Sequence, residues 1–179
     1  MTDIKQNVFA NYANDFASAT ADNDGSFNSF FPPDGTHPCV MTGISQMDAT
    51  FRERDGAETH EHDATLIKFH YTLLEDSGSQ GDPRSFDGAP FVFPNSGKDG
   101  LLTEKGRIRV DIGLRRLKGH ITTILGTAAT PGAGLDEIVT ITQTEEIPVM
   151  VKCKSDISKM DPNKKWPTEW IVERLQQDD

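Results

Sequence analysis

Both tryptophans of the chain lie in the segment DPNKKWPTEW, residues 161–170. Lys164 and Lys165 come directly before Trp166, so a flat aromatic ring follows two cationic side chains. Nucleic acid bases stack on such rings, at about 1–3 kcal/mol per base, while lysine and arginine side chains bind the phosphates. Either this segment faces a ligand that is both flat and anionic, or its rings pack on a core.

The two tryptophans are predicted to have different roles. Pro167 fits the first position of a short helix, in which Trp166 and Trp170 would lie near each other. Trp170 forms an apolar group with Ile171 and Leu175, which is typical of a packing anchor. We therefore predict that Trp166 stacks on bases and that Trp170 packs on the core.

Other candidates for the same chemistry lie on predicted strands and on one loop edge. Lys68 and His70 alternate with apolar residues, as do Lys152 and Lys154, which places each pair on the polar face of a half-buried strand. A structural role is the alternative for each, because lysines are common on solvated strand faces and phenylalanines are mostly core residues. The candidate nucleic-acid-binding residues are Phe51, Arg52, Arg54, Lys68, His70, Phe91, Phe93, Lys152, Lys154, Lys164, Lys165 and Trp166.

The charge of the chain is unevenly distributed. Acidic residues outnumber basic ones by 28 to 18, and the net charge of −10 argues against non-specific binding of nucleic acid. Residues 104–120 nevertheless hold six basic and two acidic side chains, net +4, and residues 148–166 hold five and two, net +3. The sequence therefore predicts two basic islands in an acidic background, as a track for phosphates or as two solvated faces.

Apolar periodicity predicts several strands and one helix. ATLIKFHYTLL at 64–74 shows the alternation of a half-buried strand. From Ile108 to Leu125 apolar residues recur at helical spacing, with Thr103 as the N-cap and Gly126 as the stop. The predicted order is a strand at 39–51, a polar loop at 53–63, a strand at 64–74, a polar loop at 75–85, a strand at 86–94, the helix, a loop at 127–137, an extended segment or edge strand at 138–143 and a strand at 146–156.

This order defines the predicted fold class, mainly β with one helix. It matches a five-stranded OB-like antiparallel barrel with the helix between strands 3 and 4, and the alternative is a plain α+β sheet with the helix on one face. Cys39 and Cys153 are predicted to be buried thiols. The predicted domains are a flexible N-terminal arm at 1–33, an OB-like domain at 34–156 and a C-terminal extension with an acidic end at 157–179.

Two stretches resemble a group of phage-encoded proteins associated with replication and recombination. PDGTHPCVMTGI, residues 33–44, resembles their opening strand P-x-G-x-Y-x-x-x-I, with His37 in place of the usual tyrosine. VDIGLRRLKGHITTILG, residues 110–126, resembles their helix E-I-x-x-x-x-L-x-x-L. The resemblance implies an OB-like fold that binds single-stranded DNA, and a location in the cytoplasm of the host cell.

Motifs of common enzymes are missing from the sequence. It holds no Walker-type G-K-[S/T], no G-x-S-x-G and no H-E-x-x-H, and its carboxylates show no spacing of a catalytic dyad. His60 and His62 are too few for a metal site, which needs three or four convergent ligands. No run of about 18 apolar residues predicts a membrane span, and the start MTDIKQNVF lacks the order of a signal peptide. We therefore expect no enzyme activity, cofactor, metal or membrane contact, with a metal-dependent nuclease as a distant alternative.

The sequence thus predicts a non-enzymatic single-stranded DNA-binding protein that coats and protects the strand during phage replication or recombination. Its acidic C-terminal end is a candidate contact for replication or recombination proteins, and a homo-oligomer is compatible with the sequence. The alternative is a protein-interaction or structural phage module that binds no nucleic acid. Lys68, Lys152 and Lys154 discriminate between the two. If they share one concave face with exposed aromatic rings, binding is favoured, and if they are scattered, the interaction module is favoured.

Overall fold

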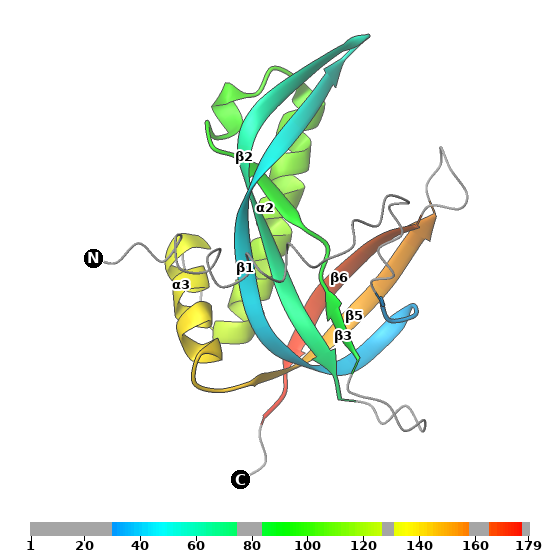
Figure 1. Ribbon diagram of the computed structural model, residues 1–179, viewed down its shortest axis with the longest axis vertical. Helices are drawn as coiled ribbons and strands as arrows, with labels where there is room; N and C mark the ends of the chain where they lie inside the picture. The colour runs from blue at the N-terminus through cyan, green and yellow to red at the C-terminus, as the bar shows by residue number, and fades with distance from the viewer. Residues whose placement is uncertain (1–29, 75–83, 127–130, 158–164, 177–179) are drawn as a thin grey trace, which may run out of the picture.

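The computed structural model describes residues 30–74, 84–126, 131–157 and 165–176. These residues form an antiparallel six-stranded sheet and two α-helices (Figure 1), which confirms the mainly β class. The strand order is β3-β2-β1-β5-β6, with β4 also paired to β2. Because β3 and β6 do not pair, this sheet is open and differs from the five-stranded barrel that the sequence predicts.

Residues 1–29 of the predicted N-terminal arm lie outside the described residues. In chain order, the described elements are β1 (Gly35–Asp55), β2 (Glu58–Leu73), β3 (Ser85–Asp87), β4 (Phe91–Pro94), the short 3-10 helix η1 (Lys98–Gly100), α2 (Glu104–Leu125), α3 (Pro131–Thr142), β5 (Ile147–Ile157) and β6 (Lys165–Arg174).

The hairpin of β1 and β2 turns tightly at Gly56 and Ala57. Gly56 adopts φ 59°, a left-handed conformation that glycine reaches without steric cost. The segment 53–63 is therefore strand on both sides of the turn, and the predicted polar loop is wrong. Charged side chains face each other across this part of the ladder, and Arg52 contacts Glu61 at 2.7 Å. The segment therefore lacks the apolar alternation by which a strand is predicted from sequence.

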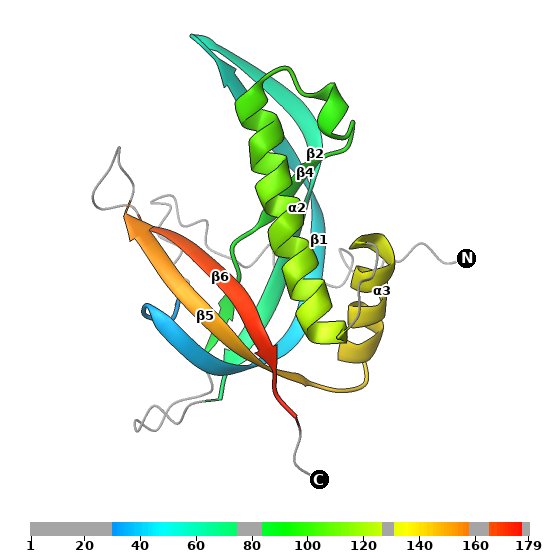
Figure 2. The same cartoon turned by 180° about the vertical axis from the view of Figure 1, so that it is seen from behind.

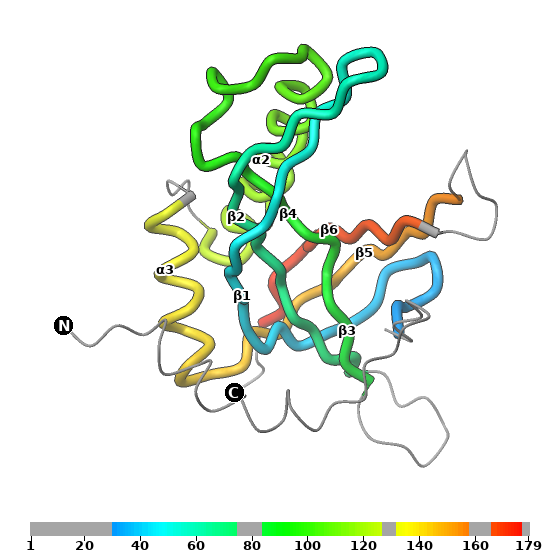
Figure 3. Tube along the Cα trace, turned by 45° about the horizontal axis from the view of Figure 1, so that its top comes forward, coloured from blue at the N-terminus to red at the C-terminus, as the bar shows by residue number. Residues whose placement is uncertain are grey.

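β1 changes partners along its length. Its first residues, Gly35 to Met41, pair with β5, and from Cys39 onward the strand pairs with β2. The register shifts between Met41 and Gly43, as in a β-bulge, which bends a strand. Figure 3 shows β1 running from beside β5 to the far end of the hairpin, which projects from the rest of the sheet.

α2 has the boundaries that the sequence predicts. The Thr103 hydroxyl accepts a hydrogen bond from the backbone N–H of Gly106 at 3.0 Å, which satisfies one of the free donors of the first turn. Gly126 adopts φ 68° at the other end, and its N–H donates to the carbonyl of Thr122. The helix lies behind β1 and β2 in Figure 1 and in front of them in Figure 2.

The core has two parts, because the buried face of β2 changes along the strand. Ile67 and Phe69 are buried near the middle of the sheet, whereas Ala64 is buried toward the turn. Neighbouring residues of a strand point to opposite faces, so a shift from odd to even positions exchanges the buried face. α2 contacts both parts, with Leu117 in the first cluster and Val110 in the second.

The predicted strand at 86–94 divides into two short strands. β3 and β4 both pair with β2, and between them the N–H of Gly88 donates to the carbonyl of Phe69. α2 and α3 therefore follow the fourth strand, not the third. Phe91 and Phe93 have the strand propensity of aromatic residues, which predicts β4. The break between β3 and β4 is set by their separate pairing with β2 and is not predicted by the sequence.

α3 replaces the predicted extended segment at 138–143 and the described part of the predicted loop at 127–137. Pro131 suits the first position of a helix, while the following β-branched residues have strand propensity. Ile138 is fully buried in the core, and α3 packs beside α2 and β1 (Figure 2). Burial of this apolar side therefore overrides the local preference.

β6 corrects the short helix predicted at Pro167. The segment Lys165–Arg174 is a strand paired to β5, with Pro167 opposite Ser155. β6 is the last strand in the sheet order, and an edge strand tolerates a residue without an N–H. The two tryptophans thus belong to the sheet itself.

Candidate nucleic-acid interface

The ladder between β5 and β6 brings both tryptophans and two lysines onto one face. Lys152 is opposite Trp170, Lys154 is opposite Thr168, and Asp156 is opposite Trp166. Residues that are opposite each other, or two apart on one strand, share a face of the sheet. Lys152, Lys154, Asp156, Trp166, Thr168 and Trp170 therefore form one surface, which we call the Trp–Lys face.

This surface is the outer side of the sheet. The alternate residues Val151, Cys153, Glu169 and Ile171 are buried on the inner side, toward the core that α2 covers. On the outer side Lys152 and Lys154 are exposed, and Trp166 keeps 55% of its surface exposed. The inner packing therefore fixes which side chains the outer side offers.

The two tryptophans differ in exposure, but Trp170 belongs to neither core cluster, so the prediction that it packs on the core is wrong. Trp166 is exposed and Trp170 is half-buried, although both lie on the outer side of the same strand. Their Cα atoms are about 13 Å apart at about 3.3 Å per strand residue, so the rings do not stack on each other as in a helix. Two separate aromatic surfaces result, with Thr168 between them.

Lys154 already has a partner on this face. Its amino group lies 2.8 Å from the carboxylate of Asp156, and this hydrogen bond raises the pKa of Lys154. Both side chains are more than half exposed, and exposed ion pairs of this kind contribute little to stability. A phosphate could therefore replace Asp156 as the partner of Lys154 at small cost.

Lys68 and His70 share this side of the sheet but lie far from the Trp–Lys face. Lys68 lies opposite Ser45 of β1, and Lys152 lies opposite Thr36 of β1. Thr36 and Ser45 are nine residues apart, which is about 30 Å of strand. The sheet also bends at the bulge between them. Lys68, Lys152 and Lys154 thus do not share one binding face but lie in two separate groups, which is the arrangement that favours the interaction module.

Asp87 neutralises the group on β2. It accepts from His70 Nδ1 at 2.8 Å and from Lys68 Nζ at 3.3 Å. Partial burial raises the pKa of Asp87, but these two contacts outweigh it and the net pKa is lowered. Lys68 and His70 are therefore weaker candidates for a phosphate than the sequence predicts.

The three phenylalanines of the predicted site are core residues. Phe51 is 2% exposed and Phe91 is 1% exposed, and Phe93 is half-buried between the two core clusters. Arg109 covers the ring of Phe51 at 4.5 Å, and Arg116 covers that of Phe91 at 4.7 Å. Bases cannot reach the rings of Phe51 and Phe91, so the prediction that they stack on bases is corrected.

The remaining predicted residues lie elsewhere or outside the described chain. Arg52 and Arg54 are exposed near the turn of the hairpin, at the opposite end of β1 from the Trp–Lys face. Lys165 begins β6, opposite Ile157. Lys164 lies outside the described residues.

A buried polar cluster around Glu169 was not anticipated. Its carboxylate accepts from the N–H of Ala89 and lies 3.5 Å from both Arg116 Nη2 and His120 Nε2. Burial, followed by the charge of Glu169, raises the pKa of Tyr71. Glu169 and His120 are almost fully buried, so the cluster joins β6 to α2 and is closed to a substrate. In a strand, Glu169 and Ile171 share one face, so a strand prediction for this segment would have placed Glu169 beside an apolar, buried residue.

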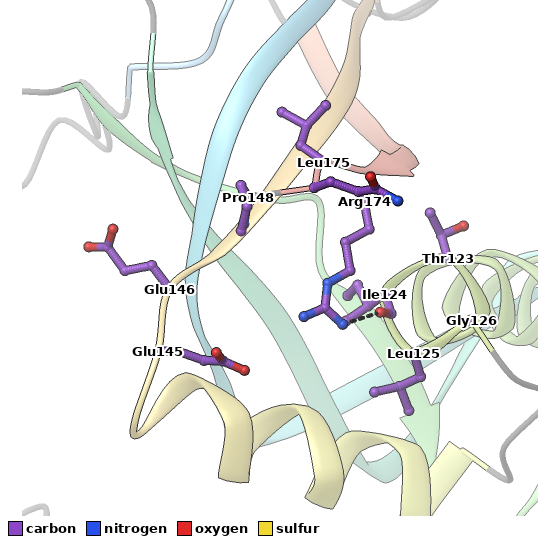
Figure 4. A pocket seen from close by; sticks show the side chains of 10 residues that line it. Thr123, Ile124, Leu125, Gly126, Glu145, Glu146, Pro148, Arg174 and Leu175 are labelled. Carbon is purple, nitrogen blue, oxygen red and sulfur yellow. Dashed lines mark hydrogen bonds between the residues drawn. The ribbon is translucent and has the colours of Figure 1, made fainter. Parts of the chain in front are cut away.

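A surface pocket lies where α2 ends beside β5 and β6 (Figure 4). Its volume is about 530 Å³. Arg174 projects into it and donates to the carbonyl of Ile124 at 3.0 Å, which satisfies a carbonyl in the last turn of α2. Glu145 and Glu146 lie on the other side. The arrangement stabilises the end of α2 and does not bring a nucleophile and a base together.

The parts of the chain that the structure describes contain two histidine–carboxylate contacts but no cluster of metal ligands. There, His60 lies 3.6 Å from Glu58 and His62 lies 2.6 Å from Glu53, but no group of three or more His, Cys, Asp or Glu side chains could hold a metal ion. Within the same residues, neither helix has the length and apolar character needed to span a bilayer.

Comparisons of the chain with protein-family models, with curated proteins and with solved structures return no match.

Proposed function

We propose that this protein binds single-stranded nucleic acid, DNA in particular, without catalysis, and that the Trp–Lys face is where the bases bind. The observation that carries the proposal is the ladder register that places Lys152, Lys154, Trp166 and Trp170 on one side of β5 and β6. Aromatic rings would stack on bases and the lysines would bind phosphates, which is how single strands are bound without strong sequence preference.

The distribution of charge supports the proposal. The net charge of −10 opposes binding through the surface as a whole, so a polyanion requires a local basic surface. Lys152 and Lys154 belong to the island at 148–166, net +3, and both are exposed. A duplex is a poor ligand for this face, because its bases are stacked and paired.

The biological setting of the proposal comes from the resemblance to phage-encoded replication and recombination proteins. In that setting the protein would coat and protect single-stranded DNA in the cytoplasm of a host cell. An OB-like ancestry belongs to the same proposal, with the open, bent sheet in place of a closed barrel. The acidic C-terminal end would then contact other replication or recombination proteins.

The proposal is tested by fluorescence anisotropy of a labelled oligo-dT of about 30 nucleotides, long enough for two typical OB footprints. Protein is titrated at low and moderate salt, with an unlabelled duplex of equal length as competitor, and tryptophan emission is followed in parallel. We expect salt-sensitive binding that the duplex does not displace, with quenching of tryptophan emission. Absence of binding at low salt would overturn the proposal.

A protein-interaction role is the second candidate, favoured by the outer side of α2. Ile108 and Ile112, four residues apart, are 48% and 53% exposed, and Leu102 before the helix is 61% exposed. Apolar residues at this spacing form a stripe on a helix, and an exposed apolar stripe is typical of an interaction surface. A protein that fails to bind oligo-dT at low salt would leave this role as the better one.

A further inference from the structure

A second basic surface lies at the opposite end of β1, beside the turn of the hairpin. A pocket of about 520 Å³ opens there between the last residues of β1 and the first turns of α2. Among the described residues four cationic side chains line it, and we call it the hairpin-tip pocket. They are Arg52, Arg54, Lys105 and Arg109.

Two of these cations are held in place by the fold. Arg109 Nη1 donates to the backbone carbonyl of Arg52 at 2.9 Å, and its guanidinium lies over the ring of Phe51. Arg52 Nε contacts the exposed carboxylate of Glu61 at 2.7 Å. Arginine keeps further N–H donors in each case, because its guanidinium carries five.

The other two cations, Arg54 and Lys105, are exposed at the mouth of the pocket. Neither forms an ion pair or a side-chain hydrogen bond with any residue in the part of the chain that the structure describes. They come from elements about 50 residues apart in sequence, so only the packing of α2 against the hairpin brings them together. Like charges gathered without partners favour an anionic ligand.

Glu53, the one acidic residue among the described residues that line the pocket, does not cancel this charge. The carboxylate of Glu53 accepts from the N–H groups of Leu102 and Thr103, and it contacts His62 at 2.6 Å. Its two oxygens are thus occupied at the start of α2, and the helix terminus is not open to a ligand. Attraction of an anion therefore comes from the arginine and lysine side chains.

We propose that the hairpin-tip pocket binds a backbone phosphate of the same nucleic acid strand whose bases bind at the Trp–Lys face. This inference rests on the proposed function. β1 connects the two surfaces, with Thr36 opposite Lys152 at one end and Arg54 at the other. Eighteen residues separate Thr36 from Arg54, so at most about 60 Å of strand lies between them. A long strand can therefore engage both surfaces, and a short one cannot.

The test compares two double variants that remove the same charge from different places. Arg54→Gln with Lys105→Gln changes the pocket, and Arg115→Gln with Lys118→Gln changes the exposed side of α2. All four side chains are exposed, so we expect both variants to fold, and their thermal unfolding is measured alongside. Binding is measured with oligo-dT of about 6 and about 30 nucleotides, because single-strand footprints begin near 4 nucleotides.

We expect the pocket variant to bind the longer oligonucleotide about tenfold more weakly than the control variant. Its slope of log K against log salt should be smaller by about 0.7, since one lost phosphate contact removes about 0.7 for a single strand. Binding of the shorter oligonucleotide should be the same for both variants.

Other outcomes overturn the inference and separate it from the proposed function. Equal weakening by both double variants would mean that only total charge matters. A pocket variant that binds the longer strand like the unchanged protein would remove the pocket from the interface and leave the Trp–Lys face standing. Failure of the unchanged protein to bind either oligonucleotide would overturn both proposals.

Discussion

Lys152 on β5 lies directly opposite Trp170 on β6, on the outer side of the sheet. The next outward pair is Lys154 opposite Thr168, and the pair after it is Asp156 opposite Trp166. Where β5 and β6 meet, a chain with net charge −10 thus presents two lysines beside two tryptophans.

Trp166→Ala should weaken the binding of oligo-dT about tenfold, because one stacked base contributes about 1–3 kcal/mol. Trp166→Phe should restore most of the affinity, since a phenyl ring also stacks. With 55% of its surface exposed, Trp166 adds little to the core, so thermal unfolding of both variants should match the unchanged protein. Unchanged affinity of the alanine variant in anisotropy titrations would remove Trp166 from the interface.

Lys152→Gln should reduce the salt dependence of oligo-dT binding. Loss of one phosphate contact lowers the slope of log K against log salt by about 0.7. Lys118→Gln on α2 is the matched control, because it removes one exposed charge away from the Trp–Lys face. Titrations at four salt concentrations measure both slopes, and an equal decrease in the two variants would contradict a specific contact at Lys152.

Glu169→Ala should destabilise the protein by about 3 kcal/mol, since removing one partner of a buried ion pair leaves the others uncompensated. The carboxylate is fully buried beside Arg116 and His120, and it accepts from Ala89 N. Glu173→Ala, on the exposed side of the same strand, should change the free energy of unfolding by less than about 0.5 kcal/mol. Urea unfolding followed by circular dichroism distinguishes the two.

Glu53 should make the stability depend on pH in the acid range. Burial raises its pKa, but hydrogen bonds from Leu102, Thr103 and His62 outweigh this and lower the pKa from 4.5 to about 2. A folded pKa below the unfolded one stabilises the protein above about pH 4.5, and this contribution is lost as pH falls toward 2.

Glu53→Gln should therefore flatten the pH dependence of urea unfolding in that window and cost about 2 kcal/mol at pH 7, where hydrogen bonds to a charged group are lost. Glu58→Gln, at an exposed position in the same hairpin, is the control. A variant at Glu53 that keeps the full acid dependence would assign that dependence to other carboxylates.

Cys153 should be unreactive in the folded protein. Burial, followed by the charges of Glu169 and Asp34, raises the pKa of its thiol to about 12, and the thiolate is the reactive form. Cys39 is also a buried free thiol. Iodoacetamide at pH 8 should modify neither cysteine without denaturant and both in urea, as mass spectrometry would show. Rapid modification of the native protein would contradict the burial of these strands.

Residue types predicted which strand faces are exposed, but not which residues from different strands lie together in the candidate site. The alternation around Lys152 and Lys154 marked an exposed strand face, and β5 confirms it. The pairing with Trp166 and Trp170 could not be foreseen, because Pro167 reads locally as a helix start. Phe51 and Phe91 were predicted to be exposed and are buried, because alternation alone does not tell which side of a strand is covered.

The sequence by itself determined the features that depend on local chemistry. Thr103 and Gly126 set the limits of α2, because capping depends on side chains and backbone angles within one turn. The alternation at 64–74 determined a strand, and the distribution of lysine and arginine determined two basic islands.

Tertiary structure decided everything that depends on partners distant in sequence. The open sheet, the helical state of α3 and the union of both tryptophans with two lysines follow from pairing and burial between remote segments. The energy of such contacts exceeds local propensities of a few tenths of a kcal/mol per residue. Local patterns therefore defined the parts of this protein, and long-range packing decided which of them face one another.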